Sequence, residues 1–569
     1  MKTHKFKLLF LATLATLCSQ PVLAALNSYT HANGSTVVNI NQADENGLSH
    51  NMYQNFNVSS DGMILNNSIT DLVREKGNIA RNSNLDKSAS LILNEVISKS
   101  PSALNGYIEV AGQKADVIIA NPNGITCSGC SFINTSRATL TTGTPKFTDG
   151  ALTGFDVANG TITVNGNGLK GADYTDLLAQ KINIQGQIET TQLKAIAGNY
   201  TYDVASGQAV ATGTSQLRSN SIDVSELGGA TAGIIQLQTT EAGAGVNNSG
   251  VLNATNLYIA ANGTLTNSGT IETEVMSATA GGSITNRGAL SASQAVLQAT
   301  DAFTNSGTIE TGLISAIAGG SMTNGGALSA RQAVLQASNA FTNTGTIKTT
   351  DYANIVSLSK IVNGSNAQIN AGGAVNIVSL AGNIENSGTI TTPKNLVIQT
   401  GFNTVNGVTT AVANTSLHNS GSIQAGNLSL YAVKEIGLLS GGDVTSQGTA
   451  YLLATNVSNA ATLTAKNASI VATNDFSNQG GIQTTGALSV TGKNSIANTG
   501  TMKAGTLTLA TEGTISNSSC FLWVFCSEGT MSADKISITA PKITSISNLD
   551  GKYTTQVLEL NKPATNSSL

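Results

Sequence analysis

Short runs rich in Ile, Val, Leu and Ala alternate along most of the chain with turn-forming Asn, Gly, Ser and Thr. One polar signal repeats, an Asn-x-Gly triplet followed closely by an apolar residue. It recurs every 19 residues, at Asn248, Asn267, Asn286, Asn305, Asn324 and Asn343. The spacing then loosens and tightens again, through Asn386, Asn419, Asn459, Asn478, Asn498 and Asn517. A period near 20 residues with such turns indicates a solenoid.

The pattern predicts an all-β chain folded as a parallel β-helix. A coil of about 19–20 residues holds three short strands, whose inward Ile, Val, Leu and Ala stack on their equivalents in the next coil. Asn and Gly suit the corners, and equivalent Asn side chains can hydrogen-bond in a ladder. A leucine-rich repeat has a similar period but needs a fixed Leu lattice and a helical segment, which this pattern lacks.

Composition supports strands and excludes two other classes. Charged residues make up 11% of the 569 residues, aromatic residues make up 4%, and there are 7 Pro. Long amphipathic helices need more charge, and disordered chains usually carry more charge or more Pro. The 28 Lys and Arg against 32 Asp and Glu give a mildly acidic chain without a basic patch. We therefore expect no nucleic-acid partner.

The first residues predict export. A basic start, "MKTHKFK", precedes the apolar "LLFLATLATLC" and the small residues of "PVLA". This order is typical of a secretory signal peptide, here residues 1–24, which is not part of the fold.

Four cysteines remain after residue 24, and an even number in an exported chain favours disulfides. Their closeness in sequence pairs Cys127 with Cys130 and Cys520 with Cys526. A zinc site or a thioredoxin-like centre at Cys127 lacks the further ligands or the helix that it needs. The second pair flanks "FLWVF", which reads as an inserted hairpin. Its aromatic residues either fold onto the rod or form an exposed contact for a partner.

The less regular N-terminal part carries several distinctive blocks in a fixed order. They are "FNVSSDGMILNNS", "ILNEV", "GYIEVAGQKADVIIANPNGI" and "CSGCSFINTSRATLTTG". Over about residues 31–200 the chain closely resembles the secretion domain of two-partner secretion exoproteins. That family includes filamentous haemagglutinins, pore-forming haemolysins and contact-dependent inhibition proteins.

The resemblance implies a right-handed β-helix with an N-terminal cap and two motifs linked to export. One motif is intact as "NPNGI", at Asn121, Pro122, Asn123, Gly124 and Ile125. The other, usually "NPNL", is "NSNL" here, with Asn82, Asn84 and Leu85 in the matching places. The implied partners are the Sec translocon and an outer-membrane β-barrel transporter with periplasmic docking domains.

The residues offer little for catalysis, a cofactor or a metal, and we expect none of these. His31, His50 and His418 are scattered without metal-ligand spacing. "GNGLKG" at residues 166–171 fits a dinucleotide-binding pattern, but no alternation of strands and helices surrounds it. Acidic and basic residues do not gather as a polysaccharide lyase would require.

These observations predict a secreted or surface-displayed adhesin like the filamentous haemagglutinins, which binds host or neighbouring cells. The alternative is a toxin-class protein, a haemolysin or a contact-dependent inhibition stick, short or without its effector end. For that class we expect a longer chain with a C-terminal domain of different composition. The predicted parts are a signal peptide (1–24), a secretion domain (25–245), a β-helical rod (246–549) and a final strand and tail (550–569).

Overall fold

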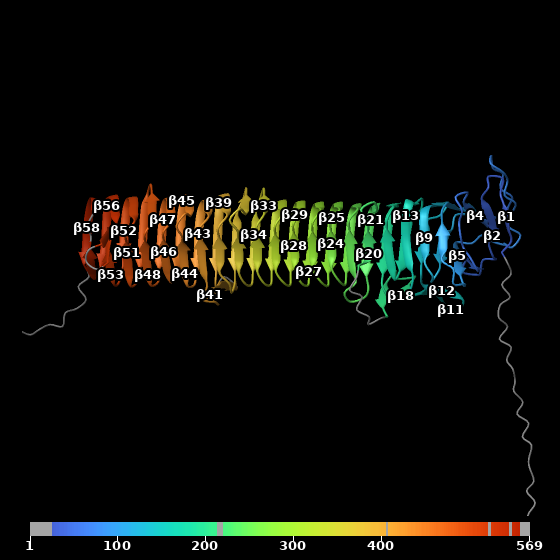
Figure 1. The fold of residues 1–569 in the computed structure, drawn as a ribbon, viewed down its shortest axis with the longest axis horizontal. Coiled ribbons are helices and arrows are strands. Elements are labelled where there is room, and N and C mark those ends of the chain that lie inside the picture. The colour runs from blue at the N-terminus through green and yellow to red at the C-terminus, as the bar shows by residue number, and fades with distance from the viewer. Residues whose placement is uncertain (1–25, 213–219, 406–407, 522–524, 546–548, 558–569) are drawn as a thin grey trace, which may run out of the picture.

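The computed structural model describes residues 26–212, 220–405, 408–521, 525–545 and 549–557. These residues form strands and turns that wind into one long parallel β-helix, from the N-terminal end at blue to the C-terminal end at red (Figure 1). The all-β solenoid expected from the sequence is therefore confirmed. The predicted signal peptide lies outside the described residues. In the described part of the chain, no helix is long and apolar enough to span a membrane.

One coil of the rod shows how the repeat makes the fold. β24 (Leu265–Asn267) and β25 (Thr270–Ala280) pair in parallel with β26 (Ile284–Asn286) and β27 (Ala289–Ala299), each residue with its equivalent 19 positions later. The pairing of the long strands skips position 274, where the chain turns a corner. Each coil thus has three short straight segments, as the sequence predicts.

The core is a column of inward side chains that runs the length of the rod. The first position of successive short strands is filled by Leu265, Ile284, Phe303, Met322 and Phe341, stacked in parallel register and buried. Each of these side chains is packed between its equivalents in the two adjacent coils. Truncation of one of them therefore leaves a cavity between its neighbours.

The repeated asparagines form the expected ladder. The side-chain Nδ2 of each donates to the Oδ1 of its equivalent in the next coil, at 2.6–2.9 Å, and all are buried. Asn363 belongs to this ladder although the repeat pattern missed it, because its coil reads Asn-Gly where the others read Asn-x-Gly. A second run joins Asn459, Asn478, Asn498 and Asn517.

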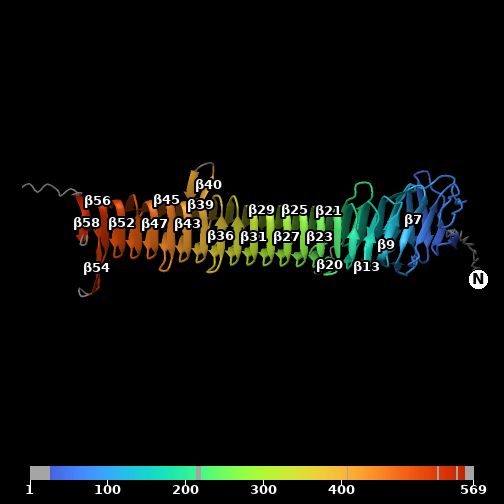
Figure 2. The ribbon, with the colours of Figure 1, turned by 90° about the horizontal axis from the view of Figure 1, so that it is seen from above.

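Three features depart from the plain solenoid. β1 (Ser28–Thr30) pairs antiparallel with β2 (Thr36–Asn39) at the N-terminal end. A second sheet lies along one side of the N-terminal part (Figure 1), made of β11 (Thr144–Thr148), β12 (Ala151–Val157), β18 (Tyr200–Asp203) and β19 (Ala209–Ala211). Hairpins project from the rod at β40 (Phe402–Val405) with β41 (Val408–Ala411), and at β54 (Ser518–Phe521) with β55 (Phe525–Glu528) (Figure 2).

The hairpin at β54 and β55 is the insertion that the sequence indicates. Cys520 and Cys526 are register partners in its backbone. Their side chains and those of the residues between them lie outside the described part, so the predicted disulfide and the packing of the aromatic residues stay predictions.

Candidate functional site

The "NPNGI" segment forms a tight turn between β8 (Asp116–Ala120) and β9 (Ile125–Ile133). The side-chain Oδ1 of Asn121 accepts hydrogen bonds from the backbone N of Asn123 at 3.0 Å and from its Nδ2 at 2.9 Å. The backbone N of Gly124 donates to the carbonyl of Asn121 at 3.1 Å. An Asn side chain that holds its own backbone two residues later is an Asx turn.

The same Asn side chains tie the turn to the preceding coil. Asn121 is fully buried and donates from Nδ2 to the carbonyl of Ser100 and to Oγ of Ser102, both at 2.9 Å. Asn123 donates from Nδ2 to the carbonyl of Ser98 at 2.8 Å. The turn is therefore fixed in place by two amides from the motif.

The "NSNL" segment has the same geometry without proline. Oδ1 of Asn82 accepts from the backbone N of Asn84 at 3.0 Å, and the backbone N of Leu85 donates to the carbonyl of Asn82 at 3.2 Å. Nδ2 of Asn82 donates to the carbonyls of Ile40 and Asn66, both at 2.9 Å. The hydrogen bonds, and not the ring of proline, define this turn.

In the "NPNGI" turn, the residues that are exposed differ from those that hold the turn together. Asn121 and Ile125 are buried, Pro122 is half-buried and Asn123 is exposed. Gly124 has a φ of +113°, in the region that favours glycine, and a Cβ there would lie 3.1 Å from the carbonyl oxygen of Thr161. A partner can therefore reach Pro122 and Asn123, while Asn121 and Gly124 shape the backbone that presents them.

The cysteines directly after this turn form a disulfide inside the β-helix. Cys127 and Cys130 are joined with Cα atoms 5.3 Å apart, and both side chains lie buried in the core. In the parallel register, Cys127 is flanked by Leu104 and Val164 of the coils on either side. The bond thus fixes the bend of β9 immediately beyond the turn.

The glycines of "GNGLKG" serve the coil that follows. Gly166 and Gly168 have φ of +53° and +77° and lie within β13 (Thr161–Lys170), where its pairing with β9 shifts register. A Cβ on Gly168 would lie 1.8 Å from the carbonyl oxygen of Gln187. Close packing of strands therefore explains this motif.

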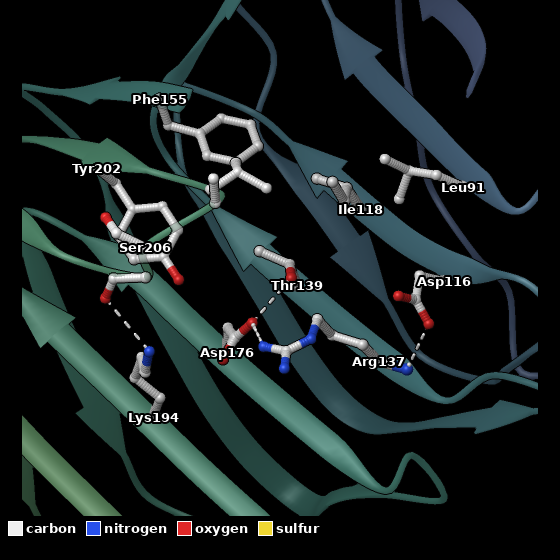
Figure 3. A pocket seen from close by; sticks show the side chains of 13 residues that line it. Leu91, Asp116, Ile118, Arg137, Thr139, Phe155, Asp176, Lys194, Tyr202 and Ser206 are labelled. Atoms are coloured by element: carbon white, nitrogen blue, oxygen red, sulfur yellow. Dashed lines mark hydrogen bonds and ion pairs between the residues drawn. The ribbon is translucent and has the colours of Figure 1, made fainter. Parts of the chain in front are cut away.

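A cavity of about 370 Å³ opens between the second sheet and the β-helix (Figure 3). On its floor Nη1 of Arg137 lies 2.7 Å from Oδ2 of Asp176, to which Oγ1 of Thr139 also donates at 3.2 Å. Nζ of Lys194 donates to the carbonyl of Gly207 at 3.3 Å and lies 5.9 Å from the centre of the Tyr202 ring.

Burial changes the titration of two groups at this cavity. It raises the pKa of Tyr202 to about 12, with a smaller contribution from the nearby carboxylate of Asp176. It also raises the pKa of Asp116, against the opposing hydrogen bond from the backbone N of Arg137. The sequence did not reveal this cluster, because its members come from different coils and from a loop of the second sheet.

Comparisons with known proteins found one family match and several relatives that cover part of the chain. Residues 19–273 match the family described as the TPS secretion domain. Toxin CdiA of Yersinia pestis is 44% identical over 254 residues, which cover 42% of this chain and 8% of that protein. Hemolysin of Proteus mirabilis is 38% identical over 240 residues, which cover 42% of this chain and 15% of that protein. The chain therefore corresponds to a small part of the length of these relatives.

A solved structure is similar to about half of the chain. The crystal structure of the filamentous hemagglutinin secretion domain is 30% identical, with a TM-score of 0.42. The match covers 54% of this chain and 98% of that one. Together with the intact "NPNGI" turn, the family match and the two relatives show that residues 19–273 carry the secretion domain of the two-partner secretion exoproteins.

Proposed function

We propose that the chain is an adhesin-like exoprotein that leaves the cell through a dedicated outer-membrane transporter, with the Asn121 turn as part of the docking signal. The observation that carries the proposal is the tip of the turn, where Pro122 is half-buried and Asn123 is exposed, on a backbone held by three sets of bonds. Two motif amides bind the preceding coil, and a buried disulfide follows directly. A rigid, exposed tip suits recognition, because little conformational entropy is lost on binding.

The fold suits passage of an unfolded chain. Each coil of a solenoid contacts only its neighbours, so the rod can fold coil by coil as it emerges from the transporter. The Asn ladder has a direction that matches this order, since Nδ2 of a folded coil donates to Oδ1 of the next one. Each finished coil then presents a donor that selects the register of the coil that follows.

The rod beyond the secretion domain is the proposed binding element. Its surface carries few charges and many Thr, Ser, Asn and Gln side chains, which can hydrogen-bond to receptors on host or neighbouring cells. A stiff rod places that surface away from the cell that displays it.

A second candidate is a toxin-class protein, favoured by the names of the relatives, which include a toxin and a hemolysin. Their similarity covers 42% of this chain, a share close to that of the residues that match the secretion domain. A shared secretion domain supports a shared route of export more strongly than a shared activity. A binding assay on intact cells beside a lysis and growth-inhibition assay separates the two candidates.

Export is tested with Asn121→Ala and Asn123→Ala in cells that contain the transporter. We expect both variants to accumulate in the periplasm, with at least a tenfold lower secreted fraction than the native chain. The matched control is Asn105→Ala, a change at another exposed Asn that precedes Gly in the same domain. Normal secretion of both motif variants would contradict the docking role.

A further inference from the structure

One outward face of the rod carries no charge over many coils. It consists of two rows of stacked residues in the second half of the long strands, which we name the neutral face. The first row runs from β23 (Val251–Ala261) to β52 (Thr501–Ala510) as Tyr258, Ser277, Val296, Ser315, Val334, Asn354, Asn376, Val397, Ser429, Tyr451, Ser469, Ser489 and Thr508.

The second row lies two residues further along each strand. It runs as Ala260, Thr279, Gln298, Ile317, Gln336, Val356, Val378, Gln399, Tyr431, Leu453, Val471, Thr491 and Ala510. Large apolar side chains on this face are open to solvent, with Tyr258 44%, Val296 50% and Ile317 38% exposed.

The neighbouring faces of the same coils do carry charges. The row that begins at Asn253 includes Glu272, Glu310 and Lys348. The row on the short strands includes Glu385, which pairs with Lys360 at 2.8 Å. Exposed sheet surfaces usually carry charges that discourage association, so the neutral face lacks a protection that the other faces have.

The neutral face continues into a face that is already covered by a sheet. Ala260 is stacked on Gln238, which is stacked on Ile196, and Ile196 is stacked on Leu178. Ile196 and Leu178 are fully buried because Phe155 and Tyr200 of the second sheet pack on them. In the secretion domain this side of the β-helix is thus a sheet-on-sheet interface, and in the rod the same side is open.

We infer that the neutral face packs against the neutral face of a second copy of this chain. Interface cores are depleted of charged residues and mix apolar, aromatic and amide side chains, as this face does. Coils about 4.8 Å apart give the two rows an area of roughly 800 Å² per copy, which is the size a stable complex needs. A second rod has the same coil spacing and can match the face along its length, whereas a compact partner would cover a few coils.

The test uses the full chain, purified and folded, in sedimentation velocity between about 1 and 50 μM. We expect a dimer whose population rises with concentration. The variant Val296→Lys with Ile317→Lys puts two charges on the face of each copy, and we expect it to weaken association at least tenfold. The control, Thr304→Lys with Thr323→Lys, puts the same charges on the short-strand face and leaves the dimer intact. Circular dichroism and the melting temperature verify that both variants fold.

A native chain that stays monomeric at every concentration overturns the inference. So does equal weakening by the control, because the effect would then come from net charge. Binding of a neutral glycan to a monomeric chain, lost in the Val296 and Ile317 variant alone, would assign the face to a carbohydrate and likewise overturn it. The outcome is independent of the export assay, which measures location and not association.

Discussion

Leu438 occupies the ladder position in the coil between Asn419 and Asn459 and is stacked directly on both. It therefore interrupts the asparagine ladder. The two amide groups that face Leu438 make hydrogen bonds within their own coils instead. Nδ2 of Asn419 donates to the carbonyl of Gly421 at 3.0 Å, and Oδ1 of Asn459 accepts from the backbone N of Ala461 at 3.2 Å. Leu438 itself is buried. The ladder is therefore two runs of hydrogen bonds, and apolar packing bridges the coil between them.

An alanine inside the ladder removes two of its hydrogen bonds. In Asn305→Ala, Nδ2 of Asn286 loses one acceptor and keeps the carbonyls of Gly288 and Thr308, while Oδ1 of Asn324 loses the Nδ2 donor of Asn305 and stays buried. We expect a loss of about 2 kcal/mol in the free energy of unfolding of these coils. Hydrogen exchange of the amides in β28 (Phe303–Asn305) and its neighbours measures it. Ser306→Ala, on the same turn, is the control and should change protection little.

A buried aromatic side chain of the core should contribute more to the free energy of unfolding than one asparagine of the ladder. Phe303 is buried between Ile284 and Met322. We expect Phe303→Ala to cost about 3–5 kcal/mol, through lost apolar burial and the cavity left behind. Thr304→Ala, which changes the outward residue of the same strand, serves as the control. Equal melting temperatures for the two variants would contradict the packing described for this layer.

The disulfide should contribute modestly to stability. Its loop holds two residues between the cysteines, so the chain-entropy gain is about 2 kcal/mol. We expect the double change Cys127→Ala and Cys130→Ala to lower the melting temperature by a few degrees and to reduce the further effect of a reductant. Two free thiols at these positions in the secreted native chain, found by mass spectrometry, would refute the disulfide.

The raised pKa of Tyr202 at the cavity predicts that the protein loses stability at alkaline pH. The folded pKa of Tyr202 is about 12 and its ordinary value is near 10, so the folded state holds this proton more tightly. Its contribution is fully present below pH 10 and is lost as the pH rises from 10 to 12, where the unfolded chain ionises first. Tyr202→Phe should therefore flatten the fall of the melting temperature over this range. An unchanged slope would show that Tyr202 does not titrate in this way.

The coils could be predicted because their signal is local and repeated. Inward Ile and Leu and the Asn corners recur at a constant spacing, so one coil predicts the next. The interruption at Leu438 was not predicted, because a buried leucine at the ladder position breaks the sequence pattern and still fits the coil. The second sheet was not predicted either, for another reason. Its strands are short and irregular, and Phe155 and Tyr200 become buried only when this sheet packs on Leu178 and Ile196 of the β-helix.

The resemblance to the secretion domain indicated the segments at Asn121 and at Asn82 as motifs linked to export, and their docking role stays a prediction. Only part of their geometry could be expected from the sequence. That the segment at Asn82 adopts the same Asx turn without proline depends on hydrogen bonds to the preceding coil, at Ile40 and Asn66. Such bonds join residues far apart in sequence, and no local pattern encodes them.

The docking role of the Asn121 turn is tested most directly by photo-crosslinking in the periplasm. A photoreactive amino acid replaces Asn123, at the exposed tip, or Asn105, at the control position, in cells that contain the transporter. The proposal predicts a crosslink between position 123 and the periplasmic part of the transporter, and none or far less from position 105. Efficient crosslinking from position 105 with none from position 123 would contradict it.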